Sequence, residues 1–93
     1  MTVTQIENIH KGKFQIKDDG IILGEMKYKW EDEDIMTIEH TKVNPDFEGQ
    51  GVGNALVMEA VKFAREKNVK ILLHCPFAKS VFAKNQEIRD VLL

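Results

Sequence analysis

The segment "VNPDFEGQGVGNAL" (residues 43–56) carries three glycines at alternate positions, Gly49, Gly51 and Gly53, just ahead of an amphipathic run. Glycine is unfavourable inside strands and helices, so this spacing indicates a special backbone requirement. A glycine-rich turn that enters a helix leaves backbone N–H groups unpaired at the positive end of the helix dipole, where a phosphate can approach closely. The segment therefore favours an anion-binding turn over the alternative of a flexible turn packed against a sheet.

The run after the glycines predicts a helix from about Gly51 to Lys67. Asn68 is expected to end it in the left-handed conformation that is common at helix C-termini. Apolar residues recur at helical spacing and form one stripe that would face a core. This stripe consists of Leu56, Val57, Ala60, Val61 and Ala64.

Strand patterns precede the helix. Residues 11–30 predict two strands around Asp19-Gly20, a favoured hairpin turn, and residues 34–43 predict a third strand. Apolar and polar residues alternate in the second strand, as in a sheet with one wet side. The residues expected on its core face are Ile22, Gly24, Met26, Tyr28 and Trp30.

The chain after the helix completes the expected fold. Residues 69–75 predict a short apolar strand that Pro76 ends, and residues 78–85 predict a short helix. The element order predicts an α/β (α+β) fold with a mixed, mostly antiparallel sheet, one long helix after the third strand and a short C-terminal helix. The long helix would provide a right-handed crossover to a parallel strand.

Length and composition limit the classes of protein to consider. At 93 residues the chain fits a single domain, residues 1–93. The net charge of −2 argues against a dedicated nucleic-acid-binding protein, and no apolar run approaches the ~20 residues of a membrane span. The first residues lack the apolar segment of a secretory signal, and the single cysteine excludes an intramolecular disulfide. We therefore expect a cytoplasmic protein that binds neither nucleic acid nor membrane.

Two common nucleotide-binding motifs fit the glycine segment poorly. A Walker loop ends in Gly-Lys-Ser/Thr, but here Gly53 is followed by Asn54 and Ala55. The dinucleotide-binding pattern G-x-G-x-x-G lacks its third glycine, since Leu56 stands in that position. That fold also places its glycines after the first strand of a parallel sheet, whereas an antiparallel pattern precedes them here.

The segment instead resembles the acetyl-CoA motif of the GNAT superfamily of N-acetyltransferases, Arg/Gln-x-x-Gly-x-Gly/Ala. Gly51 and Gly53 occupy its small positions, and Glu48 replaces its Arg or Gln. We expect Glu48 to point away, because an acidic side chain repels a pyrophosphate, so the donors would be mainly backbone N–H groups. The resemblance implies that the strand end pairs with the pantetheine arm and that the loop wraps the pyrophosphate. It assigns cofactor-binding roles to Thr41, Val43, Gly49, Gln50, Gly51, Val52, Gly53, Asn54 and Phe77.

Nearly all of the chain resembles a subfamily of very small, single-domain GNAT proteins, the Yjdj type. These proteins share a His-Thr pair before the glycine loop, here His40-Thr41. They also share a cysteine followed by an aromatic residue after the next strand, here Cys75-Pro76-Phe77. The resemblance implies that the cysteine lies near the thioester of acetyl-CoA and that a clear acceptor-binding region is missing.

Cys75 is the candidate nucleophile. It ends a strand whose parallel neighbour is expected to end near Val43, and ligands of open α/β sheets prefer such carboxyl ends. An ordinary thiol is only a few per cent thiolate at neutral pH, so a nucleophilic role needs a base. His40, expected on the core face of its strand, is a candidate base or orienting group. Strand alternation sends His74 to the opposite face from Cys75.

Each candidate also has a purely structural interpretation. A lone cysteine in an apolar strand is usually a small buried hydrophobic residue, and His40 is equally consistent with a hydrogen-bonded core histidine. Phe77 fits a core or a pocket wall. Many GNAT enzymes use a tyrosine after this strand as a general acid, but the chain's one tyrosine is Tyr28. One thiol and scattered histidines predict no metal site.

The sequence therefore predicts an acetyl-CoA-dependent N-acetyltransferase. The acetyl group would pass to an amine, either directly or through an acetyl-Cys75 intermediate. So little chain remains for an acceptor pocket that we expect a protein or other macromolecule as acceptor, or a second subunit that completes the site. The alternative from another class is a non-catalytic acyl-CoA-binding or sensing module that acts with a partner protein.

Overall fold

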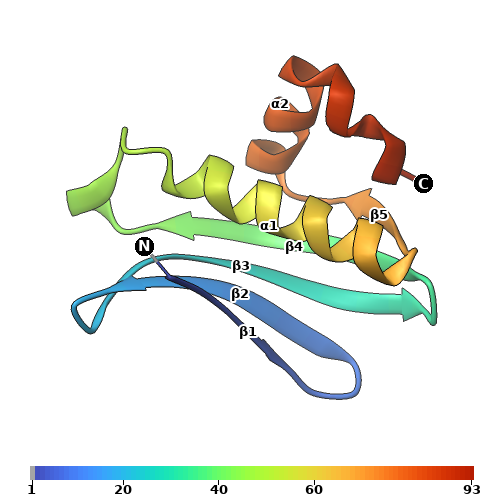
Figure 1. Ribbon diagram of the computed structural model, residues 1–93, viewed down its shortest axis with the longest axis horizontal. Helices are drawn as coiled ribbons and strands as arrows, with labels where there is room; N and C mark the ends of the chain where they lie inside the picture. Colours follow the sequence, from blue (N-terminus) through green and yellow to red (C-terminus); the bar gives the residue numbers. More distant parts are fainter. Residues whose placement is uncertain (1) are drawn as a thin grey trace.

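The computed structural model describes residues 2–93 and contains a five-stranded sheet in the order β1-β2-β3-β4-β5 (Figure 1). Strands β1 to β4 are antiparallel to their neighbours, and β5 pairs with β4 in parallel. The strands are β1 (Thr2–Glu7), β2 (Lys11–Asp18), β3 (Ile21–Asp32), β4 (Ile35–Val43) and β5 (Lys70–Leu73). The helices are η1 (Pro45–Phe47), α1 (Val52–Lys67), α2 (Pro76–Lys84) and η2 (Gln86–Val91), of which η1 and η2 are 3₁₀.

The expected fold class is confirmed, with a mixed, mostly antiparallel sheet, one long helix and a short C-terminal helix. The expected place of the long helix is wrong, because β1 precedes the predicted hairpin and α1 therefore follows the fourth strand. β1 is an edge strand with five of its six residues exposed. A strand of this kind does not need alternating apolar residues, so its sequence lacks the pattern by which a strand is recognised.

The hairpin between β2 and β3 turns at Asp19-Gly20, as predicted. Both residues have positive φ angles, 49° and 78°, as in a type I′ turn. The register between the strands shifts soon after the turn, where Leu23 forms a bulge. Leu23 is therefore buried, while Ile22 is 42% exposed. The predicted core position of Ile22 is wrong for this reason.

Helix α1 covers one face of the sheet, and α2 lies on the same side (Figure 1). α1 ends where predicted, with Asn68 in the left-handed conformation and its N–H donating to the carbonyl of Ala64. Full burial of a Val or Leu side chain stabilises a fold by roughly 1.5–3 kcal/mol, so the apolar stripe holds α1 against the sheet. All five predicted stripe residues are buried: Leu56, Val57, Ala60, Val61 and Ala64.

Four aromatic side chains fill the space between the sheet and the carboxyl-terminal half of α1. The ring of Phe14 lies 5.3 Å from that of Tyr28 and 5.8 Å from that of Phe63, and Trp30 packs beside them. The Tyr28 hydroxyl donates to the Glu7 carboxylate at 2.6 Å, and the Trp30 indole N–H donates to the same oxygen at 3.0 Å. We call this region the aromatic end of α1.

The other face of the sheet carries no helix within residues 2–93 (Figure 1). Gln15 and Thr37 are nevertheless buried there, because longer neighbours cover them. The Gln15 amide donates to Glu25 at 2.6 Å, and the Thr37 hydroxyl donates to Glu31 at 2.9 Å. The buried polar groups on this face therefore have hydrogen-bond partners within the sheet itself.

Candidate functional site

Strand β5 ends earlier than β4 at the end of the sheet where β4 leads into the glycine loop. They pair over only the four residues of β5, and a bond of 2.9 Å from the His74 N–H to the Ile38 carbonyl continues the pairing. β4 runs on to Val43. Among residues 2–93, the last residues of β4 therefore have β3 on one side and no strand on the other.

The backbone of β4 offers hydrogen-bonding groups beyond the end of β5. On the β3 side, the Asn44 N–H donates to the Leu23 carbonyl at 2.8 Å. Backbone groups of successive strand residues point to alternate sides, so those of Thr41 and Val43 face away from β3. An extended ligand can pair with such an edge as an additional strand would.

The loop from β4 to α1 is shaped by a 3₁₀ turn and by two glycines. The Asn44 side chain accepts a hydrogen bond from the Asp46 N–H at 3.0 Å, and Pro45 starts η1. Gly49 and Gly51 have φ angles of 79° and 80°, and a Cβ at either position would have no atom within 4 Å. Backbone conformation, and not close packing, therefore explains these two glycines.

The N–H groups of this loop lack acceptors within residues 2–93. The first hydrogen bond that enters α1 runs from the Ala55 N–H to the Gly51 carbonyl at 3.0 Å, and no side chain caps the helix. The N–H groups of residues 49–54 donate to nothing in this part of the chain. Unpaired donors at the positive end of a 16-residue helix are suited to bind a phosphate group.

A cavity of about 430 Å³ adjoins the loop, the end of β4 and the start of α2. It brings together eight of the nine residues predicted to bind the cofactor; Gln50 is not among its lining residues. The eight residues are Thr41, Val43, Gly49, Gly51, Val52, Gly53, Asn54 and Phe77.

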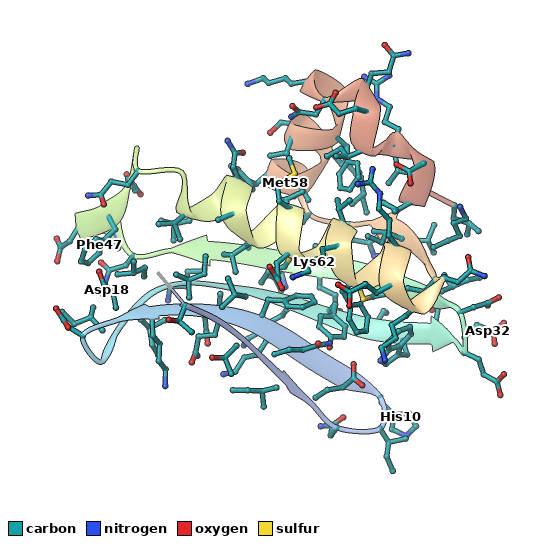
Figure 2. All side chains as sticks on the ribbon, in the orientation of Figure 1. His10, Asp18, Asp32, Phe47, Met58 and Lys62 are labelled. Carbon is teal, nitrogen blue, oxygen red and sulfur yellow. The ribbon has the colours of Figure 1, made fainter. Side chains whose placement is uncertain are left out.

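Two further residues line this cavity, Phe47 and Glu48. Phe47 lies in η1, beyond the end of β4 (Figure 2). Sequence reasoning missed it, although the Asn44-Pro45 pair signals the tight turn that brings it to the cavity. Glu48 is exposed and belongs to the lining, so an acidic residue stands at the position where the GNAT motif has Arg or Gln.

The third glycine has a different explanation from the other two. Gly53 is buried in the first turn of α1, and a Cβ there would lie 2.5 Å from Cζ of Phe77. Phe77 belongs to the first turn of α2 and is 40% exposed. Gly53 therefore allows a close approach between the amino-terminal turns of the two helices. Phe77 lines the cavity, which agrees with the interpretation of this residue as a pocket wall.

Cys75 is buried, 3% exposed, at the junction between β5 and α2. Its Sγ donates a hydrogen bond to Oγ1 of Thr41 at 3.3 Å. Thr41 in turn lines the cavity. The contact therefore links the thiol to the cavity, just beyond the end of β5.

His40 does not lie on this side of the sheet. The pairing of β4 with β3 skips Glu39, so that His40 pairs with Lys27 and Thr41 pairs with Met26. This bulge reverses the alternation along β4: Thr41 joins the core face, and the exposed His40 points to the helix-free face. The predicted position of His40 on the core face is wrong, and the structure does not bring its imidazole to Cys75.

His74 is exposed, as expected for a residue whose side chain alternates with that of buried Cys75. Within the described residues, no three His, Cys, Asp or Glu side chains gather in a way that could hold a metal ion. None of the described helices is both long and apolar enough to cross a membrane.

Comparison with known proteins identifies the family. The model of the family "GCN5-related N-acetyl-transferase" matches residues 13–91. A GCN5-like protein from Staphylococcus aureus is 39% identical in sequence, with a TM-score of 0.77 over 99% of this chain and 87% of that protein. No protein with a curated description matches.

More distant solved structures share the fold. A ribosomal-protein-alanine N-acetyltransferase from Brucella melitensis is 18% identical, with a TM-score of 0.71 over 83% of this chain and 62% of that protein. An aminoglycoside N-acetyltransferase solved in complex with CoA is 15% identical, with a TM-score of 0.61 over 83% of this chain and 67% of that protein. With the family model and the staphylococcal relative, these findings show that the chain belongs to the GCN5-related N-acetyltransferase family.

Proposed function

We propose that this protein binds acetyl-CoA and transfers the acetyl group to an amine. The observation that carries the proposal is the set of unpaired N–H groups of residues 49–54, beside the open edge of β4. These donors and the amino-terminal dipole of α1 suit a pyrophosphate. Membership of the family and the CoA complex of one distant relative support this choice of ligand.

The pantetheine arm would extend from the loop along β4. It contains amide groups, and it would pair with the backbone of Thr41 and Val43 as a peptide strand does. Its thioester would then lie near Thr41 and Cys75, which are in contact with each other. The cavity of about 430 Å³ connects the loop with Thr41 and supports this path.

The acetyl transfer is proposed to be direct. The amine nitrogen attacks the thioester carbonyl carbon, a C–N bond forms, the C–S bond breaks, CoA leaves as the thiol, and the nitrogen loses one proton. Holding the amine nitrogen in line with the thioester carbonyl carbon supplies much of the catalysis. No side chain other than Thr41 hydrogen-bonds to Cys75 within residues 2–93, so no base for an acetyl-Cys75 route adjoins the thiol. This absence favours the direct route over the covalent one.

The acceptor is proposed to be a macromolecule, or to bind with the help of a second subunit. Within the described chain the hairpin β1–β2 leads straight into β3, and no helix covers the face of the sheet opposite α1 (Figure 1). Few residues therefore remain to enclose a small acceptor. The same observation supports a second candidate, an acyl-CoA-binding module whose partner protein does the chemistry.

Mass spectrometry of the intact protein and of added peptides would distinguish direct transfer, the acetyl-Cys75 route and the non-catalytic module. Wild type and Cys75→Ser are incubated with acetyl-CoA, and a mixture of lysine-containing peptides is then added. Direct transfer predicts acetylated peptides from both proteins and no adduct on either one. The covalent route predicts one acetyl group on wild type only, discharged by the peptides. Acetyl-CoA binding without any acetylated peptide would favour the module.

A further inference from the structure

The helix-free face of the sheet gathers six of the chain's 13 Lys and Arg residues. Residues paired across antiparallel strands point to the same face, and Phe14 and Tyr28, on the alternate positions, pack with Phe63 of α1. The six, which we call the lysine face, are Lys11, Lys13 and Lys17 of β2, Lys27 and Lys29 of β3, and Lys42 of β4.

Two pairs of these lysines stand directly opposite each other. Lys11 pairs with Lys29, and Lys13 pairs with Lys27. Like charges in directly opposed positions destabilise a sheet. In each pair one lysine is compensated: Lys13 lies 3.0 Å from Glu25, and Lys29 lies 3.4 Å from Glu31.

The other member of each pair remains available. Within residues 2–93, Lys11 and Lys27 form no ion pair, and both are exposed. The chain as a whole carries a net charge of −2, so this face is a local concentration of positive charge in an acidic protein. A negatively charged ligand would relieve the repulsion that the fold otherwise bears.

A hollow of about 530 Å³ adjoins the same face. Its lining includes Ile6, Lys11, Lys13, Lys27 and His40, which come from four strands. The carboxylates of Glu7 and Glu39 also line it, and that of Glu7 already accepts hydrogen bonds from Tyr28 and Trp30. The hollow gives a ligand a shaped surface in the middle of the lysine face.

We propose that the lysine face docks an extended segment of a partner protein with acidic residues at alternate positions. Side chains on one face of a strand repeat about every 6.6–6.8 Å, and an extended peptide presents its own alternate side chains at the same spacing. Such a segment can therefore set carboxylates against Lys11 and Lys13 along β2, and against Lys27 and Lys29 along β3. This inference goes beyond the acetyl-CoA site and does not depend on it.

Two other anionic partners fit less well. Single-stranded nucleic acids are bound by aromatic platforms and Arg, but Tyr28 and Trp30 pack on the α1 side, and the arginines lie in α1 and η2. A membrane-binding face needs a group of exposed apolar residues among its lysines. In the hollow Ile6 is the exposed large apolar side chain.

The test measures binding of a fluorescently labelled, alternating Glu-Thr peptide by anisotropy. The variant Lys11→Gln/Lys27→Gln removes the uncompensated lysine of each opposed pair and leaves both ion pairs in place. We expect its affinity to fall about tenfold, and wild-type binding to weaken as salt increases. The control Lys62→Gln/Lys84→Gln changes exposed lysines of α1 and α2, Lys62 being marked in Figure 2, and should bind as wild type does.

Folding and the acetyl-CoA site are controlled separately. The double variant should resist urea at least as well as wild type, because it removes both like-charged pairs. Gly51→Glu should bind the peptide normally, even though it is expected to weaken CoA binding. The inference is overturned if the double variant binds as well as wild type, or if a neutral Gln-Thr peptide binds equally. It is also overturned if oligouridine or phosphatidylserine vesicles bind this face more tightly than the acidic peptide does.

Discussion

The two ends of α1 meet the sheet in opposite ways. At the aromatic end the rings interlock, and the Glu7 carboxylate accepts hydrogen bonds from both Tyr28 and Trp30. At the other end, which we call the glycine end, the N–H groups of residues 49–54 have no partner within the described chain, and a cavity of about 430 Å³ adjoins them. One helix thus has a filled end and an open end.

This difference indicates which parts of the chain provide stability and which are available for binding. Unpaired backbone donors cost little while water reaches them, but they add nothing to the fold. The aromatic end and the apolar stripe must therefore anchor α1 while its amino terminus stays free for a ligand. Substitutions at the aromatic end should change stability, and substitutions at the glycine end should change ligand binding.

The largest effect is expected at the aromatic end, for Gly12→Ala. A Cβ at Gly12 would overlap the Tyr28 ring, which is 1% exposed and held by hydrogen bonds from Gln5 and to Glu7. Because the ring is buried and held by these hydrogen bonds, we expect a loss of about 1–3 kcal/mol in the free energy of unfolding, measured with urea. CoA affinity should stay unchanged. A Gly12→Ala protein as stable as wild type would mean that this end is loosely packed.

At the glycine end, Gly51→Glu should weaken CoA binding about tenfold or more, measured by calorimetry. The substitution places a negative charge in the proposed pyrophosphate site. Gly51→Gln is the matched control, since Gln has the size of Glu, meets the same strain at the φ of 80° and carries no charge. It should bind CoA within a few-fold of wild type, and the two variants should have similar stability. Equal affinity of Gly51→Glu and wild type would contradict both the transferase and the module.

The sequence is sufficient to predict α1 and its surroundings because the signals there are local. The stripe has a helical period, Asn68 is a recognisable C-cap, and Gly49 and Gly51 mark the turn by the backbone conformation that they allow. The signals for β5 and α2 are equally local, although β5 already ends at Leu73 and Pro76 starts α2 instead of ending the strand. These features need no knowledge of which strands pair.

The errors come from features that depend on pairing between distant segments. One extra residue in a strand reverses the direction of every side chain beyond it, and alternation in the sequence does not reveal where such a bulge forms. Because of the bulge at Glu39, the residue beside Cys75 is Thr41 and not His40. Because of the bulge at Leu23, Ile22 is exposed. β1 was missed because an exposed edge strand needs few apolar residues.

A smaller effect is expected where the two helices approach each other at the glycine end. Ala is favoured over Gly in a helix by about 0.5–1 kcal/mol, but at Gly53 its Cβ would collide with Phe77. Gly53→Ala should therefore stabilise the Phe77→Ala protein and not the wild type. A double-mutant cycle in urea measures this coupling. Equal effects of Gly53→Ala in both backgrounds would show that the ring of Phe77, which is 40% exposed, simply moves aside.

The smallest effect is a pH dependence that belongs to the aromatic end alone. Burial raises the pKa of Tyr28 above its ordinary value of 10.0, and the nearby Glu7 carboxylate raises it further. The unfolded chain therefore loses the phenol proton at a lower pH than the folded protein does, so this contribution to stability is complete below about pH 10 and declines as pH rises from there toward the folded pKa.

Urea midpoints measured across this range should fall more steeply for wild type than for Tyr28→Phe, in which lysine titration is retained. Because the chain has one tyrosine, phenolate absorbance reports on Tyr28 alone. It should appear together with unfolding and should be unaffected by CoA, since the ligand is proposed to bind at the other end of α1. A folded protein that shows phenolate near pH 10 would mean that water reaches the Tyr28 hydroxyl, and the aromatic end would then be as open as the glycine end.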